Sequence, residues 1–194
     1  MKVKHLFFIL LFIFTIALTY YQTSIDVIIS SPPGSFFNFK TKKIENCPVG
    51  YYCLEANMTE PVICPQGRFC PKSGMIYPYN CPISNFCPEQ GLIQPSECPK
   101  GFYCPEYNLI LPKECDKGYF CPKSNMHNKI YCPMGTYCPQ GSINPNKCPS
   151  GHYCPSNYIA YPIKCNDKQS CPYLGMIEPL VCSEGKDCGR KRDL

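Results

Sequence analysis

The pattern of the chain is set by CPKGFYCPEYNLILPKE, residues 98–114, which is one copy of a repeat that covers most of the sequence. Five residues separate the two cysteines of a repeat, and ten separate its second cysteine from the next repeat. The spacing returns every 17 residues between Cys47 and Cys188, except that the repeat beginning at Cys132 has 16. Such a period indicates an array whose members bury apolar side chains only against their neighbours.

Nine repeats contain all 18 cysteines of the 194-residue chain. Their first cysteines are Cys47, Cys64, Cys81, Cys98, Cys115, Cys132, Cys148, Cys165 and Cys182, and their second cysteines are Cys53, Cys70, Cys87, Cys104, Cys121, Cys138, Cys154, Cys171 and Cys188. This cysteine content is typical of a disulfide scaffold in a secreted protein. Cytosolic thiols are kept reduced, so we expect the chain to fold in an oxidising compartment.

The repeat follows the template C-P-x-G-x-[YF]-C-P-x-x-[GN]-[MLI]-x-x-P-x-x. Its glycine and its Gly/Asn position are the residue types that tolerate a left-handed backbone. The apolar position is assigned to Met58, Met75, Leu92, Leu109, Met126, Ile143, Ile159 and Met176. The closing proline is present in every repeat except the fifth and the ninth.

Each repeat therefore has one aromatic residue, one aliphatic residue and two cysteines, enough for one disulfide. These few side chains cannot form an independent core. We expect the aromatic residue of one repeat to cover the aliphatic residue of the next. Frequent Pro and Gly exclude helices and long strands. The predicted fold is small and disulfide-rich: an elongated tandem array of nine ~17-residue loops with at most short β bridges. Between their two cysteines, the eighth and ninth repeats lose the aromatic residue and the proline, which predicts a polar terminal cap.

Three regular pairing schemes are open to the cysteines. Pairing across the five-residue gap (Cys47 with Cys53, and so on) uses all eighteen. Pairing across the ten-residue gap leaves Cys47 and Cys188 unpaired, and pairing the first cysteine of one repeat with the second of the next leaves Cys53 and Cys182 unpaired. Loop-closure entropy does not separate the first two schemes. The absence of unpaired cysteines favours the five-residue gap.

Residues 1–19 are predicted to be a signal peptide, because Lys2 and Lys4 precede an uncharged run from Leu6 to Leu18. Cleavage is expected between residues 17 and 24. The alternative is an uncleaved signal-anchor, since the uncharged sequence continues to Ile25 and a span needs about 20 apolar residues. Such an anchor is the one membrane contact that the sequence suggests.

The remaining boundaries follow from composition. Residues 20–46 have no cysteine and contain Pro32-Pro33-Gly34, so they are predicted to be a flexible leader. The cysteine-rich array is residues 47–188, and residues 189–194 are a basic tail. The last four residues, KRDL, faintly resemble an endoplasmic reticulum retention signal.

No catalytic or metal-binding pattern stands out. Structural zinc sites use C-x2–4-C pairs, and none occurs; no Ser-His-Asp pattern or phosphate-binding glycine loop is present either. We therefore expect no enzyme activity, metal or cofactor. The formal net charge of +5 lies partly in the signal peptide and the tail, and the array mixes both signs. A nucleic acid partner is therefore not expected.

The string CPxGxYCP, as in Cys98 to Pro105 and Cys132 to Pro139, resembles the ephrin-receptor-like cysteine-rich repeat of the growth-factor-receptor class. Tandem runs of it are similar to those in secreted and surface proteins of protozoa, including the cysteine-repeat modular proteins of apicomplexan parasites. The resemblance covers residues 47–188 and implies an adhesive, receptor-ectodomain or coat module. It does not indicate a ligand.

Binding residues are predicted at the variable positions that precede each new repeat. The candidates are Tyr77, Tyr79, Leu111 and Tyr161, while Asn57 begins a glycosylation sequon. The predicted function is a secreted or surface-associated, non-catalytic binding or adhesion module that contacts an extracellular protein or glycan. Two alternatives remain: a structural component of an extracellular wall or coat, and a protein retained in the endoplasmic reticulum lumen.

Overall fold

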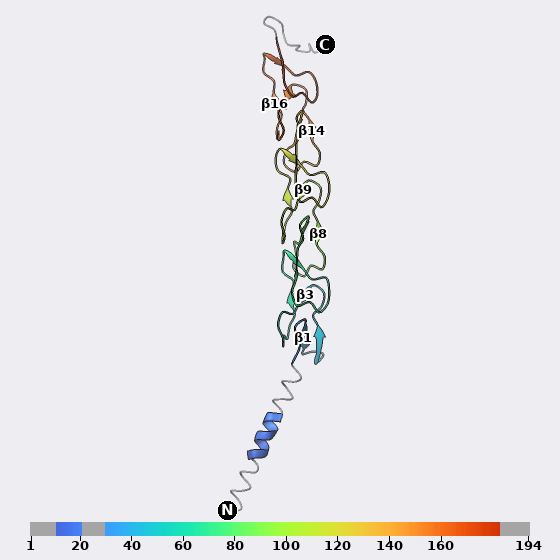
Figure 1. Cartoon of the computed structure of the whole chain (residues 1–194), viewed down its shortest axis with the longest axis vertical. Helices are drawn as coiled ribbons and strands as arrows, with labels where there is room; N and C mark the ends of the chain where they lie inside the picture. Colours follow the sequence, from blue (N-terminus) through green and yellow to red (C-terminus); the bar gives the residue numbers. More distant parts are fainter. Residues whose placement is uncertain (1–10, 21–29, 183–194) are drawn as a thin grey trace, which may run out of the picture. The chain divides into compact units, whose positions relative to one another are not determined.

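The computed structural model describes residues 11–20, which are helical, and residues 30–182, which form short β hairpins (Figure 1). Contacts divide the chain into two compact units, one over Met1–Tyr79 and Gln90–Gln94 and the other over Asn80–Glu89 and Pro95–Leu194. Within the described residues, no helix is long and apolar enough to cross a bilayer. The signal peptide and its cleavage site extend beyond those residues, as do the ninth repeat after Cys182 and the basic tail.

Every described strand belongs to a two-stranded sheet made of consecutive strands. In order, the strands are β1 (Ser35–Asn38), β2 (Lys43–Asn46), β3 (Tyr51–Tyr52), β4 (Val62–Ile63), β5 (Arg68–Phe69), β6 (Tyr79–Asn80), β7 (Asn85–Phe86), β8 (Ser96–Glu97), β9 (Phe102–Tyr103), β10 (Lys113–Glu114), β11 (Tyr119–Phe120), β12 (Ile130–Tyr131), β13 (Thr136–Tyr137), β14 (Asn146–Lys147), β15 (His152–Tyr153), β16 (Ile163–Lys164), β17 (Gln169–Ser170) and β18 (Leu180–Val181). From β3 onward, the first strand of each hairpin precedes the second cysteine of a repeat, and the second strand precedes the next repeat. The predicted small, disulfide-rich fold with little regular structure is confirmed.

The described disulfides all bridge the five-residue gap, so the favoured pairing scheme is confirmed for them. The pairs are Cys47–Cys53, Cys64–Cys70, Cys81–Cys87, Cys98–Cys104, Cys115–Cys121, Cys132–Cys138, Cys148–Cys154 and Cys165–Cys171. Their Cα atoms are 5.9–6.3 Å apart, within the usual range. Cys182 is also disulfide-bonded, and its expected partner, Cys188, lies outside the described residues.

Successive repeats are joined by a recurring set of four backbone hydrogen bonds. Between the first and second repeats, the amides of Gly50 and Cys53 donate to the carbonyls of Cys70 and Met75 at 2.9 Å. In the same junction, the amides of Cys64 and Gly74 donate to the carbonyls of Gly50 and Cys47. The junction between the fourth and fifth repeats, in the other compact unit, has the equivalent bonds to Cys121, Met126, Gly101 and Cys98.

The core consists of disulfides with a thin apolar cover. The cysteines from Cys47 to Cys154 are fully buried. Tyr52 of the first repeat packs against Met75 and the Cys64–Cys70 disulfide of the second. Phe86 of the third repeat packs in the same way against Leu109 of the fourth. These contacts confirm that the aromatic residue of one repeat covers the aliphatic residue of the next.

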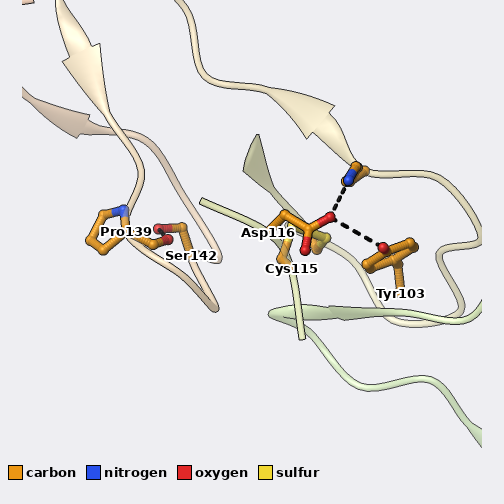
Figure 2. The surroundings of a disulfide bond; sticks show 7 residues. Tyr103, Cys115, Asp116, Pro139 and Ser142 are labelled. Atoms are coloured by element: carbon orange, nitrogen blue, oxygen red, sulfur yellow. Dashed lines mark hydrogen bonds and ion pairs between the residues drawn. A yellow bond between two sulfur atoms is a disulfide. The ribbon is translucent and has the colours of Figure 1, made fainter. Parts of the chain in front are cut away.

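The assignment of Ile143 to the apolar position of the sixth repeat is wrong. The carbonyl that accepts the hydrogen bond of this position belongs to Ser142, which receives it from the amide of Cys121 at 2.9 Å. Ser142 is buried and Ile143 is exposed. The missing residue lies between Pro139 and Gly141, which moves serine into the apolar position. The hydroxyl of Ser142 donates to the Pro139 carbonyl at 2.5 Å (Figure 2), which satisfies this buried polar group.

The prediction of a flexible leader is wrong for residues 31–46, which form a further repeat without cysteines. Ser31 and Phe37 occupy the two cysteine positions of this segment, the cysteine-free repeat, and both are buried. Its amides at Gly34 and Phe37 donate to the carbonyls of Cys53 and Met58 at 2.8 Å, as those of Gly50 and Cys53 do at the junction between the first and second repeats. The buried Phe37 ring packs edge-on against Phe39 with centroids 5.1 Å apart, and the segment is ordered without a disulfide.

The cysteine-free repeat ends in a polar hairpin. β1 and β2 pair in register from Ser35–Asn46 to Asn38–Lys43. At the tip, the Asn38 amide donates to Glu45 at 2.9 Å and the Thr41 hydroxyl donates to the same carboxylate at 2.5 Å. These hydrogen bonds lower the pKa of Glu45, with that from Thr41 contributing most. A polar cap of the type predicted for the C-terminal repeats thus lies at the N-terminal end of the array.

Substitution of two glycines by alanine tests whether the backbones of alternate repeats lie in close contact. Gly135 and Gly151 both have positive φ, but a Cβ on Gly135 would lie 2.7 Å from the Gly175 carbonyl oxygen, whereas one on Gly151 meets none of the described residues within 4 Å. Gly151→Ala should cost about 1–2 kcal/mol of unfolding free energy from backbone strain alone. Gly135→Ala should cost about 1–3 kcal/mol more, because the backbone must also move apart. Chemical denaturation of the two variants measures the difference, and equal costs would contradict the contact.

The cysteine-free repeat predicts a tenth disulfide. The double variant Ser31→Cys/Phe37→Cys should form one during oxidative refolding, because these positions correspond to the two cysteines of every other repeat. Alkylation followed by intact mass should find no reactive thiol in the double variant and one in Ser31→Cys alone. Two reactive thiols in the double variant would show that residues 31 and 37 are not placed as a cysteine pair.

Candidate binding surface

Asp116, Lys129 and Tyr158 are three of the residues by which the second compact unit departs from the repeat template. Asp116 follows Cys115, at a position where six repeats have proline. Lys129 occupies the closing position, where seven repeats have proline. Tyr158 occupies the Gly/Asn position of the seventh repeat. The structure brings these three departures together in one group of side chains.

Lys129 is the centre of this group. Its ammonium forms an ion pair with the carboxylate of Asp116, and the Tyr103 hydroxyl donates to the same carboxylate at 3.2 Å (Figure 2). The Lys129 nitrogen also lies 4.4 Å from the ring centroid of Tyr119 and 5.4 Å from that of Tyr103. Cation–π contacts of this length are favourable. Lysine at the closing position thus links the fourth and fifth repeats through side chains.

Tyr158 joins the group from the seventh repeat. Its ring centroid lies 5.3 Å from that of Tyr119 and 5.5 Å from that of Tyr131. Tyr119 and Tyr131 face each other across the hairpin of β11 and β12. We call Tyr103, Asp116, Tyr119, Lys129, Tyr131 and Tyr158 the tyrosine–lysine cluster.

The backbone of Tyr158 is strained. Its φ of 67° lies in the left-handed region, which is unusual for a bulky residue. The surroundings fix it there: its amide donates to the Cys132 carbonyl at 3.0 Å, and its carbonyl oxygen lies against Gly118, where a Cβ would clash. Strain of this kind concentrates at functional sites. The strained tyrosine at a position that usually has Gly or Asn therefore indicates a functional role for the Tyr158 side chain.

The charges of the cluster balance one another. The hydrogen bond from Lys129 holds the pKa of Asp116 below its ordinary value, and the hydrogen bond to Asp116 raises the pKa of Lys129. Both groups are therefore ionised at neutral pH. The cluster presents partly exposed phenol rings, with Tyr131 51% and Tyr158 53% exposed. Rigid aromatic side chains of this type dominate the energetics of binding interfaces.

The four residues that sequence analysis proposed for binding are all exposed by half or more. Tyr77 and Tyr79 lie in the first compact unit, where Tyr79 packs edge-on against Phe69 with centroids 5.7 Å apart. Leu111 and Tyr161 lie in the second, where the Lys117 ammonium is 5.7 Å from the Tyr161 centroid. None of the four belongs to the tyrosine–lysine cluster.

None of the six cluster residues was predicted from the sequence as a binding residue, although the sequence contains a signal for three of them. Asp116, Lys129 and Tyr158 each replace a template residue, and a search for such replacements would have selected all three. The contact between the fifth and seventh repeats is not visible in the sequence, because the template relates only neighbouring repeats.

Asn57, the sequon residue, is exposed in the first compact unit. Its φ of 62° is that of the Gly/Asn position, and its amide oxygen accepts a hydrogen bond from the Ser31 amide at 3.1 Å. Asparagine thus has a structural role here as the residue that continues the array from the cysteine-free repeat.

The fold defines a class: a disulfide-stapled tandem-repeat protein with one hairpin and one internal disulfide per repeat. Disulfides in this number are typical of an oxidising extracellular or secretory environment. A comparison with protein-family models and with curated proteins finds no match for the chain. Among the described residues, no three His, Cys, Asp or Glu side chains gather as metal ligands do.

The ion pair predicts a pH-dependent contribution to stability. The folded-state pKa of Asp116 lies below the ordinary value of 3.8, so the pair stabilises the fold above that pH and ceases to do so as pH falls through the folded pKa. Because Asp116 is about half exposed, Asp116→Asn should cost no more than about 1 kcal/mol at neutral pH. Denaturation of both proteins should show the difference shrinking below pH 3.8. A difference that does not change with pH would contradict the ion pair.

Proposed function

We propose that the protein is a secreted or surface-associated, non-catalytic binding module of the adhesion type, which contacts an extracellular protein or glycan through the tyrosine–lysine cluster. The observation that carries the proposal is the meeting of Asp116, Lys129 and Tyr158. Three departures from a template that repeats along the array fall in one set of side chains. Template residues maintain the array, so coordinated departures from them are typical of a site with a separate role.

The geometry supports recognition in two further ways. The Tyr158 ring packs against those of Tyr119 and Tyr131, with centroids 5.3 and 5.5 Å apart, so these rings lose less freedom when a partner binds. The ammonium of Lys129 is already neutralised by Asp116, which lowers the cost of covering it. The resemblance to ephrin-receptor-like repeats, which are mostly adhesive, receptor or coat modules, agrees with this reading.

Secretion is part of the proposal. The basic and apolar N-terminal segment supports entry into the secretory pathway, and the disulfides support residence in an oxidising compartment. Residues 11–20 are helical, as the apolar core of a signal peptide can be. Glycosylation at Asn57 is compatible with the exposed position of that side chain. An alternative to secretion is retention in the endoplasmic reticulum lumen through the KRDL tail, which predicts a protein that does not reach the medium.

A structural role in an extracellular wall or coat is the second candidate function. The exposed tyrosines and aliphatic side chains along the hairpins favour it, since they offer many weak contacts to neighbouring molecules. The described disulfides do not, because each closes within its own repeat. Sedimentation of the secreted protein separates the two functions: a monomer with saturable binding supports the module, and self-assembly without a partner supports the coat.

Restoring the template tests the proposed site. The triple variant Asp116→Pro/Lys129→Pro/Tyr158→Asn carries at each position the residue that other repeats have, so it should keep the fold. It should lose binding at least about tenfold, as expected when interface anchors are removed. Binding is measured with the full secreted chain on a glycan array and on immobilised collagen, fibronectin and laminin. The control Tyr107→Ser/Tyr173→Ser removes two exposed tyrosines outside the cluster and should bind normally.

Equal losses in the triple variant and in the control would show that binding depends on exposed tyrosine in general and not on this cluster. A folded wild-type chain that binds none of these surfaces, yet assembles with itself, would replace the binding module with the coat.

A further inference from the structure

We propose that Tyr131 and Tyr158 form an oxidative cross-linking site. A carbon–carbon bond would join the ring carbon ortho to the hydroxyl of one tyrosine to the ortho carbon of the other. The product is a dityrosine that ties the fifth repeat to the seventh. This inference concerns the reactivity of two rings; from the proposed function it takes the extracellular location and not the binding role.

The two rings are already in contact. Their centroids are 5.5 Å apart with an interplanar angle of 49°, within the range in which aromatic rings touch. Both residues are anchored at the same cysteine: Tyr131 precedes Cys132, and the Tyr158 amide donates to the Cys132 carbonyl at 3.0 Å. Groups held together in this way react with a high effective concentration.

Exposure and charge select Tyr131 over Tyr119 as the partner of Tyr158. Tyr131 and Tyr158 each expose about half of their surface, so an external oxidant reaches both. Tyr119 is less exposed, and the Lys129 ammonium lies 4.4 Å from its ring centroid. A positive charge over a ring stabilises its π electrons and makes the loss of one electron less favourable. The first radicals are therefore expected on Tyr131 and Tyr158.

The reaction balances with hydrogen peroxide and a haem peroxidase of the extracellular space. Each phenol gives up one electron and one proton, which produces two phenoxyl radicals. The two radicals join through the ring carbons ortho to their oxygens. Each ring then regains its aromatic form as the hydrogen on that ortho carbon moves to the oxygen. The two electrons and two protons reduce one hydrogen peroxide molecule to two water molecules.

The composition of the chain favours this outcome. The sequence has 15 tyrosines and no tryptophan, so no indole competes for the radical. Among the described residues no cysteine is free, and no thiol there can return a hydrogen atom to it. The described disulfides all lie within single repeats. A Tyr131–Tyr158 bond would therefore supply a covalent connection between repeats, which those disulfides do not provide.

The test uses the full secreted chain, treated at low concentration with horseradish peroxidase and hydrogen peroxide. Intact mass should show a monomer that has lost two hydrogen atoms, and digestion should yield a linked peptide pair containing Tyr131 and Tyr158. Tyr158→Phe keeps the ring and the fold but should lower the yield of intramolecular dityrosine at least about tenfold, because the paired phenol is gone. Tyr173→Phe, which removes an exposed phenol outside the cluster, should leave the yield unchanged.

A second variant fixes the partner. Tyr131→Phe should move the residual cross-link to the Tyr119–Tyr158 pair at a lower yield. The proposal is overturned if Tyr158→Phe forms as much intramolecular dityrosine as the wild type. It is also overturned if the linked peptides of the wild type are spread over the other exposed tyrosines, such as Tyr107 and Tyr161.

Discussion

The four backbone hydrogen bonds at the junctions between repeats are the interaction on which the structure depends. They use the amides and carbonyls of the cysteine loop itself, so each disulfide, by closing its loop, also positions the groups that hold the next repeat. Buried backbone groups that lacked these partners would carry a large cost. Few apolar side chains are buried, so the junction hydrogen bonds and the disulfides hold together a chain with little apolar core.

This arrangement explains both the template and the freedom around it. A side chain has little room where the loops of the first and third repeats meet: a Cβ on Gly50 would lie 2.7 Å from the Gly91 carbonyl oxygen. Side chains that point away from the junction carry no such restriction. The array can therefore accept Asp116, Lys129 and Tyr158 without losing its backbone contacts, and a functional surface can be built by substitution on an unchanged scaffold.

The cysteine spacing was sufficient to predict the repeat, the pairing scheme and the thin core, because a strict period allows few regular solutions. It failed where the backbone keeps the pattern and the side chains do not. Ser31 and Phe37 extend the array toward the N-terminus without sulfur, so the array predicted from the cysteines began one repeat too late. The apolar position of the sixth repeat was assigned to Ile143 instead of Ser142, because a deletion can be aligned in two ways within one loop. Tyr158 was missed because contacts across an intervening repeat leave no trace in the spacing.

The scaffold divides its stabilisation between two kinds of bond. Disulfides restrict each loop and reduce the entropy of the unfolded chain, but the described ones connect no two repeats. The connection between repeats is therefore left to backbone hydrogen bonds, each of which adds only about 0.5–1.5 kcal/mol. Any stronger coupling must come from side chains that reach across a junction. In the second compact unit, the ion pair of Lys129 and the tyrosine rings around it make such contacts, so the cluster that departs from the template also reinforces the weakest connections of the array.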